Sequence, residues 1–156
     1  MAEWVNGVRQ YGNGIKLGVF AYLTGSETTT VTTAATYYPI AGTFANSPAN
    51  GFQTVADPAI EYTYAETKYF EIDCHATLSA DDNGRTVHIA LKKNGVLVDA
   101  SIMGTYLKTA DEPQAVSGTC VLSLAKGDKI QLIVTSSTNL DVINFQHFTT
   151  SIREFY

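Results

Sequence analysis

A period of two dominates the middle of the chain. Across residues 68–79 one parity is apolar and the other is mostly polar. The apolar parity consists of Phe70, Ile72, Cys74, Ala76 and Leu78. Because side chains on a β-strand alternate between its two faces, this pattern predicts a strand with one face in a core. Asp81-Asp82-Asn83-Gly84 follows, and Asn-Gly accepts the positive φ of a tight turn, so the strand should end there.

Similar apolar alternation recurs along most of the remaining chain between turn signals, among them Lys93-Asn94-Gly95 and Lys126-Gly127-Asp128. Strands are predicted over residues 52–55, 60–64, 86–92, 96–102, 116–124, 129–135 and 139–156, and residues 28–33 are expected to form a first strand or a stalk. Because Pro39 cannot donate a ladder hydrogen bond, residues 37–44 are expected to form an edge strand or the start of a strand. Residues 46–51 should form a loop. No segment has a helical period. About eight to ten short strands, with turn signals roughly every 8–12 residues, predict an all-β sandwich or jelly roll.

The C-terminal segment is apolar on both parities. Its large side chains are Val142, Ile143, Phe145, Phe148, Ile152 and Phe155. A strand that is apolar on both faces is usually buried on both faces. One face should therefore lie in the core and the other at a subunit interface.

The N-terminal residues 1–27 differ from the rest. Five glycines interrupt them, so no helix is expected, yet their aromatic content is too high for a solvated tail. We therefore predict two parts: an attachment arm over residues 1–27 and a sandwich knob over residues 28–156. The arm would contact a partner through Trp4, Val5, Tyr11, Ile15, Phe20 and Tyr22. The alternative is that this segment folds back over its own domain.

Size and charge exclude several classes of protein. A chain of 156 residues is long enough for one domain with a real core. The net charge is −5 and there is no basic run, which argues against nucleic-acid binding. The apolar runs are shorter than the roughly 20 residues of a membrane span. Residues 1–25 lack a basic cluster followed by an apolar core, so we expect synthesis and folding in a cytoplasm.

The two cysteines, Cys74 and Cys120, fall on the inward parity of their strands. The simplest interpretation is a pair of buried free thiols that act as small apolar residues. A disulfide is geometrically possible if the two strands are neighbours, but a cytoplasmic location argues against it. Neither cysteine fits a zinc-binding spacing, and no metal or other cofactor is expected.

No catalytic arrangement is evident. His75 and His88 fall on the outward parity while the cysteines face inward, which disfavours a Cys–His pair, and His147 also falls on a strand. The Asp81-to-Gly84 turn resembles a fragment of a calcium loop but lacks the later glutamate. We therefore expect a non-enzymatic protein.

Several short motifs resemble the jelly roll of tumour necrosis factor and the complement globular head. They are Tyr69-Phe70, Lys93-Asn94-Gly95, the L-x-x-G-D-x-I-x-L run from Leu124 to Leu132, and Phe148-Thr-Thr-Ser-Ile152. The resemblance covers about residues 30–156. It implies a ten-stranded sandwich that trimerises around a three-fold axis.

The resemblance also implies an interface. The sheet that carries residues 68–79 would also carry residues 116–124 and the C-terminal strand, and its outer face would pack on the axis. Interface residues would be Tyr69, Glu71, Asp73, His75 and Val121, with one parity of Phe145 and Phe148. Glu71 and Asp73 would hold a cation or pair with lysines. Cys74 and Cys120 would lie on neighbouring strands, and the family's receptor contacts and calcium ligands have no matching motif.

A polar version of this fold without a signal segment looks like those carried by bacteriophage virion proteins. The leading expectation is a head decoration (cement) homotrimer on the capsid surface, assembled in the host cytoplasm, that binds the major capsid protein through its arm. The alternative is a tail-fibre tip that binds a receptor or host surface glycan. A fibre tip would normally follow a long repetitive shaft, whereas this sequence is a knob plus 27 residues. An extracellular signalling ligand is less favoured, because no signal peptide is seen.

Overall fold

The computed structural model describes residues 3–5, 8–10, 17–56 and 59–155, with side chains described from residue 17 onward except at 47–48. Every regular element in these ranges is a β-strand, as the sequence predicts. Within the same ranges there is no helix of the length and apolarity that a membrane crossing requires.

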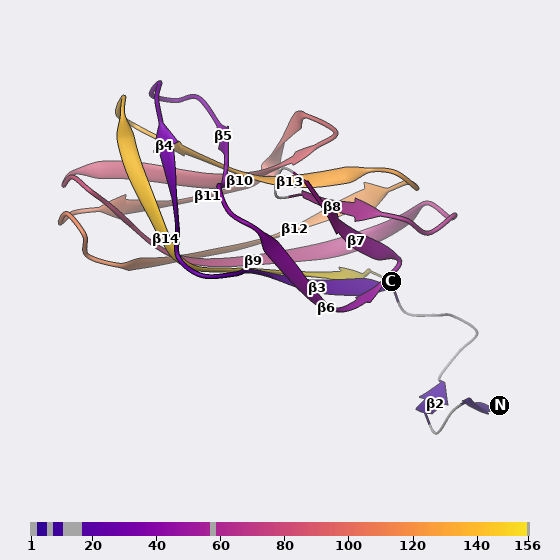
Figure 1. Ribbon diagram of the computed structural model, residues 1–156. Helices are drawn as coiled ribbons and strands as arrows, with labels where there is room; N and C mark the ends of the chain where they lie inside the picture. The colour runs from indigo at the N-terminus through magenta and orange to yellow at the C-terminus, as the bar shows by residue number, and fades with distance from the viewer. Residues whose placement is uncertain (1–2, 6–7, 11–16, 57–58, 156) are drawn as a thin grey trace.

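Two antiparallel sheets face each other as a sandwich (Figure 1). The first, here called the β9 sheet, runs in the order β12 (Gln114–Leu124), β9 (Lys68–Ala80), β14 (Asp141–Glu154), β3 (Gly18–Leu23) and β6 (Phe44–Asn50), with β4 (Glu27–Val31) also on β14. The second, the β10 sheet, runs β11 (Val96–Leu107), β10 (Arg85–Lys93), β13 (Lys129–Ser136), β8 (Ala59–Tyr62) and β7 (Phe52–Val55), with β5 (Tyr38–Pro39) also on β13. Strands β1 (Glu3–Val5) and β2 (Val8–Gln10) form a separate two-stranded sheet.

Aromatic rings fill the core between the two sheets. Phe52, Tyr62 and Phe70 form one cluster, in which each pair of ring centroids lies 5.0–5.1 Å apart. Tilted and edge-to-face contacts at this distance add to the stabilisation that burial of the rings provides. The apolar parity predicted for β9, from Phe70 to Leu78, is buried throughout, so that strand was predicted correctly.

The turn between β10 and β11 forms at the residues that the sequence predicts. Asn94 and Gly95 connect β10 to β11 with φ values of 51° and 83°. Consecutive residues at positive φ suit a tight two-residue hairpin, because that geometry matches the twist of the paired strands. The resulting hairpin begins the pairing of β10 with β11 at Lys93 and Val96.

A β-bulge in β14 overturns the prediction that this strand is buried on two faces. Phe145 pairs with Leu78 and His147 with Thr77, so Gln146 is an extra residue with no partner on β9. One extra residue reverses the parity of everything that follows it. Phe145 and Phe148, three residues apart, therefore both point into the core and are fully buried. Neither can lie at a subunit interface.

The predicted boundary between arm and knob at residue 27 is also wrong. Strand β3 pairs with β14 on one side and β6 on the other, inside the β9 sheet. Leu17, Val19, Ala21 and Leu23 are buried in the core. The backbone at Leu17 is fixed as well, because Glu154 N–H donates to the Leu17 carbonyl at 3.1 Å. The sandwich therefore starts by Leu17, and for residues 17–27 the alternative, folding onto their own domain, is the observed one.

The loop predicted over residues 46–51 is instead mostly strand β6. Pro48 is tolerated there for two reasons. Strand β6 lies at the edge of its sheet, where a missing N–H costs no ladder hydrogen bond. In addition, Val19 pairs with Ala49 and Ala21 with Asn46, so β6 carries one extra residue, a bulge, at this position.

Candidate functional site: the outer face of the β9 sheet

The outer face of the β9 sheet exposes apolar side chains from four neighbouring segments. Tyr69 on β9 is 62% exposed and Val121 on β12 is 44% exposed. Phe155 follows β14 on the outward parity, and its N–H donates to the Tyr69 carbonyl at 2.8 Å. Phe20 and Tyr22 lie on β3 with ring centroids 6.2 Å apart. Aromatic and aliphatic surface on adjacent strands is typical of an interaction surface rather than of a solvated sheet.

A charged group lies among these apolar side chains. Arg153 on β14 pairs with Glu71, and its Nη2 lies 3.0 Å from Asp73 Oδ2. Thr119 Oγ1 donates to the other oxygen of Asp73 at 2.6 Å. The Glu71 carboxylate, with Asp73, raises the pKa of Arg153 above its usual value. The residues come from three adjacent strands and are aligned by the register, since Arg153 lies directly opposite Glu71.

The predicted interface residues separate into two groups. Tyr69, Glu71, Asp73, His75 and Val121 all lie on this outer face, whereas Phe145 and Phe148 lie in the core. The expectation that Glu71 and Asp73 hold a cation or pair with lysines is replaced by an ion pair with an arginine of the same chain. Sheet β12-β9-β14 itself was predicted correctly from the resemblance.

Sequence reasoning missed half of this surface. Phe20 and Tyr22 were assigned to the arm, Arg153 and Thr119 were not singled out, and Phe155 was named only as one of the large side chains of the apolar C-terminal segment. The signal for the first two was present, because Leu17, Val19, Ala21 and Leu23 alternate with them. Glycines at 18 and 25 obscured this period of two.

For the other residues of the predicted arm, the structure describes the backbone at most. Trp4 and Val5 lie on β1, whose backbone pairs with β2, but their side chains are not described. Tyr11 and Ile15 lie outside the described residues. Of the proposed arm contacts, the structure therefore places the side chains of Phe20 and Tyr22 alone, and both lie on the sandwich.

The three histidines are separated by the fold. His75 is exposed on the outer face of β9, and His147 is exposed beside the β14 bulge. His88 lies on β10 of the opposite sheet, over Gly104 of β11, where an added Cβ would come within 2.9 Å of its Nε2. Cys74 and Cys120 face the core as free thiols, as predicted, on neighbouring strands.

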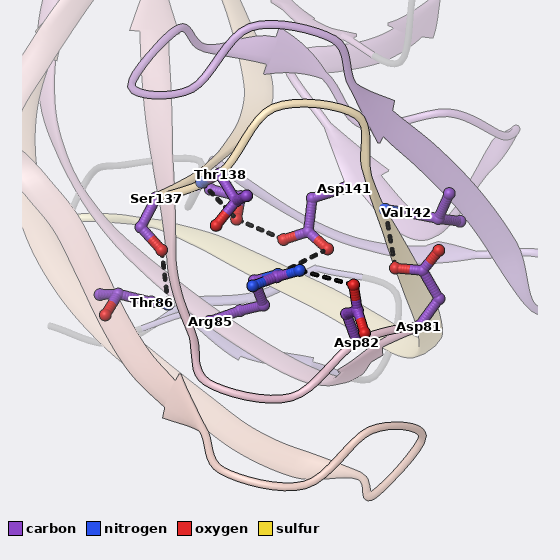
Figure 2. Close-up of polar contacts among 9 residues, drawn as sticks. Asp81, Asp82, Arg85, Thr86, Ser137, Thr138, Asp141 and Val142 are labelled. Carbon is purple, nitrogen blue, oxygen red and sulfur yellow. Dashed lines mark hydrogen bonds and ion pairs between the residues drawn. The ribbon is translucent and has the colours of Figure 1, made fainter.

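A second polar cluster closes one end of the sandwich (Figure 2). Asp141, at the start of β14, is the only one of its acids with a side chain fully shielded from solvent. It accepts a hydrogen bond from Ser136 Oγ, and its Oδ1 lies 3.5 Å from Arg85 Nε. Burial raises the pKa of Asp141, while the Ser136 hydrogen bond and the Arg85 charge act in the opposite direction.

The acidic turn after β9 is part of this cluster. Asp82 pairs with Arg85 Nη2 at 2.6 Å, and Asp81 Oδ1 accepts from Val142 N–H at 3.2 Å (Figure 2). Arg85 thus lies between one buried and one exposed carboxylate. These contacts link the β9–β10 turn to the start of β14.

The most specific motif of the sequence forms a third polar cluster. Asp128, from the L-x-x-G-D-x-I-x-L run, pairs with Lys93 Nζ at 2.8 Å and accepts hydrogen bonds from Ala125 N–H and Asn94 Nδ2. Burial alone would raise the pKa of Asp128, but these donors together lower it. Asp128 therefore ties the β12–β13 turn to the β10–β11 turn, which gives this motif a structural role.

Comparisons with known proteins identify the fold. No model of a protein family matches the sequence, and no curated protein matches it significantly. The structure is similar to that of Eiger TNF from S. frugiperda, with a TM-score of 0.62, 8% identity, and coverage of 88% of this chain and 92% of that chain. The globular domain of zebrafish complement 1qA is similar with a TM-score of 0.54 and 15% identity, and the match covers 91% of this chain and 98% of that chain. Murine APRIL is similar with a TM-score of 0.55 and 8% identity, and the match covers 87% of this chain and 98% of that chain. At these identities the likeness concerns the fold: the chain has the jelly-roll fold seen in tumour necrosis factor and complement C1q domains.

Proposed function

We propose that this protein is a non-catalytic structural or binding module that works as a homotrimer, with the outer face of the β9 sheet as the contact between subunits. The fold is compatible with a trimeric binding or structural domain. The observation that carries the proposal is the apolar surface of Tyr69, Val121, Phe155, Phe20 and Tyr22 around the Arg153 ion pairs.

The chemistry of this face suits a subunit interface. Aromatic residues and arginine are enriched at interfaces, because rings bury a large area and a guanidinium can form several directed hydrogen bonds. Arg153 has its carboxylate partners, Glu71 and Asp73, within its own chain, so burial would leave the guanidinium paired, while the group as a whole carries one excess negative charge. Each square ångström of apolar surface removed from water contributes about 25 cal/mol. A stable interface typically buries about 800 Å² per partner.

Val121→Arg should separate the trimer into folded monomers. The substitution places a long charged side chain within the proposed contact, on its outermost strand β12, whereas Val121 is exposed in the single chain and is not part of the core. The matched control is Ile102→Arg, because Ile102 is 42% exposed on the opposite sheet against 44% for Val121. Sedimentation should give three times the chain mass of 16.9 kDa for the wild type and the control, and one chain mass for Val121→Arg.

A wild-type protein that sediments as a folded monomer at micromolar concentration would refute the trimer. Dissociation by Ile102→Arg but not by Val121→Arg would move the interface to the β10 sheet.

A more specific role also belongs to this proposal: decoration of a bacteriophage head, with the major capsid protein as partner. It is supported by the β1–β2 hairpin, which contains Trp4 and is a separate sheet from the two sheets of the sandwich. A hairpin of this kind can add a large ring and a strand edge to a groove on a partner. Three copies on one trimer would raise each other's effective concentration, so weak single contacts would suffice.

Deletion of residues 1–16 should abolish capsid binding and leave a folded trimer. The deletion stops before Leu17, because that residue is buried and hydrogen-bonded to Glu154. Co-sedimentation with undecorated capsids measures the binding, and Trp4→Ala should weaken it without changing the melting temperature. Full binding by the truncated protein would refute attachment through the hairpin. Failure of the intact protein to bind capsids, combined with binding to a host surface glycan, would favour the fibre-tip alternative.

A further inference from the structure

Three sulfur-bearing side chains surround one small cavity between the two sheets. The cavity has a volume of about 10 Å³, and its lining includes Cys74 of β9, Cys120 of β12 and Met103 of β11. Such a volume corresponds to about one water-sized sphere. No other sulfur atoms are present from residue 2 onward, since the chain has two cysteines and its other methionine is Met1.

The strand register explains why the three sulfur-bearing residues line one cavity, while Cys74 Sγ also lies 3.4 Å from Thr150 Oγ1 of β14. Cys74 lies directly opposite Gly118, and Cys120 lies opposite Ile72, so the cysteines are diagonal neighbours on the inward face of one strand pair. Diagonal neighbours on an antiparallel pair have Cα atoms about 7–8 Å apart, with Cβ atoms closer. An added Cβ on Gly118 would lie 3.2 Å from Met103 Sδ, so the thioether occupies the space beside that glycine, opposite Cys74. The absent side chain at residue 118 is what admits Met103.

The cavity lies at an accessible place. Strands β11 and β12 are at the ends of their respective sheets, and they run beside each other. In β11 the four residues 99–102 face the single residue Ala90 of β10, and Ser101 from this irregular stretch lines the cavity. Cys120 retains 7% of its surface and Cys74 retains 2%. An ion could therefore reach Cys120 first and then Cys74.

We propose that Cys74, Cys120 and Met103 form a binding site for a soft monovalent metal ion, Cu(I). Two thiolates and a thioether are the ligands that Cu(I) prefers, and hard cations prefer oxygen. Zinc normally takes four N, S or O ligands, and no cluster of three or more His, Cys, Asp or Glu occurs among the described residues. This site is independent of the proposed trimer interface, because its ligands face the core.

Binding would exchange protons for the metal ion. One Cu(I) displaces one proton from each thiol, so that two Cu–S bonds form, two protons leave to solvent, and no electron is transferred. Metal and protons therefore compete, and the apparent affinity should rise steeply with pH, by up to about 100-fold per unit for two protons.

The test uses the full-length protein with Cu(I) alone, under anaerobic conditions, in competition with a chromophoric Cu(I) chelator. One ion per chain should bind, and X-ray absorption should show three sulfur neighbours. Cys120→Ser should weaken binding by at least about 100-fold, since even the loss of an outer-shell partner of a ligand costs 10–100-fold. Met103→Leu should leave two sulfur neighbours.

A measurement on the wild type guards against variants that fail to fold. With methyl-labelled methionine and Ag(I) as the diamagnetic substitute, the Met103 methyl resonance should shift at one equivalent and that of Met1 should not. Wild-type binding no tighter than that of the Cys74→Ser/Cys120→Ser protein would overturn the proposal. So would an unshifted Met103 resonance at saturation.

Discussion

Phe148→Ala is expected to lower the free energy of unfolding by about 4 kcal/mol, the typical cost of removing a buried phenylalanine ring. Phe148 is fully buried, and its ring meets those of Phe44 and Phe145 at centroid distances of 5.8 and 6.2 Å, both edge-to-face. The ring therefore contributes transfer free energy and packing contacts, and the cavity it leaves would be only partly filled. Urea denaturation of wild type and variant measures the difference.

Tyr106→Ala provides the control. Tyr106 is a similarly large ring but is 60% exposed on β11, outside the proposed subunit interface, so its loss should cost less than about 1 kcal/mol. Equal losses for the two variants would mean that Phe148 does not face the core. The β14 bulge would then be wrong, and with it the assignment of both phenylalanines.

Arg85→Met is expected to destabilise the protein by about 3 kcal/mol at neutral pH, because it leaves a buried carboxylate without its cation. The Asp141 side chain is fully buried and Arg85 is the basic side chain beside it, 3.5 Å away (Figure 2). Arg85 also pairs with Asp82, but that side chain is 67% exposed. Asp82→Asn should therefore cost less than about 1 kcal/mol, as exposed ion pairs do.

The loss of folding stability caused by Arg85→Met should depend on pH. Burial raises the pKa of Asp141 in the folded state above its ordinary value, so the folded protein binds more protons than the unfolded chain between these two pKa values. This carboxyl group therefore makes stability fall as pH rises through that window. Removal of Arg85 takes away an interaction that lowers the pKa, so the window extends to higher pH and the destabilisation shrinks toward acid.

Urea denaturation across the acidic to neutral range tests this dependence. Asp141→Asn in the Arg85→Met background should remove the part of this pH dependence that comes from Asp141, because that titrating group is gone. A loss that is the same at every pH would show that Arg85 acts through packing of its stem rather than through its charge on Asp141.

The sequence alone determined the features that depend on residues close together in the chain. The alternation from Phe70 to Leu78 identified β9 and its inward face, because strand geometry has a period of two whatever the partner strand is. Asn94-Gly95 and Gly127 identified their turns, because positive φ is a local requirement. The inward placement of Cys74 and Cys120 followed from the same parity.

Only the tertiary structure decided the features that depend on which strands are neighbours. The extra residue Gln146 is visible only against the register of β9, and it reverses the face on which Phe148 lies. Gly18–Leu23 is a strand because β14 and β6 supply its hydrogen bonds from both sides, although five glycines interrupt the N-terminal region. The Arg153 ion pairs likewise join side chains 80 or more residues apart, which local pattern cannot bring together.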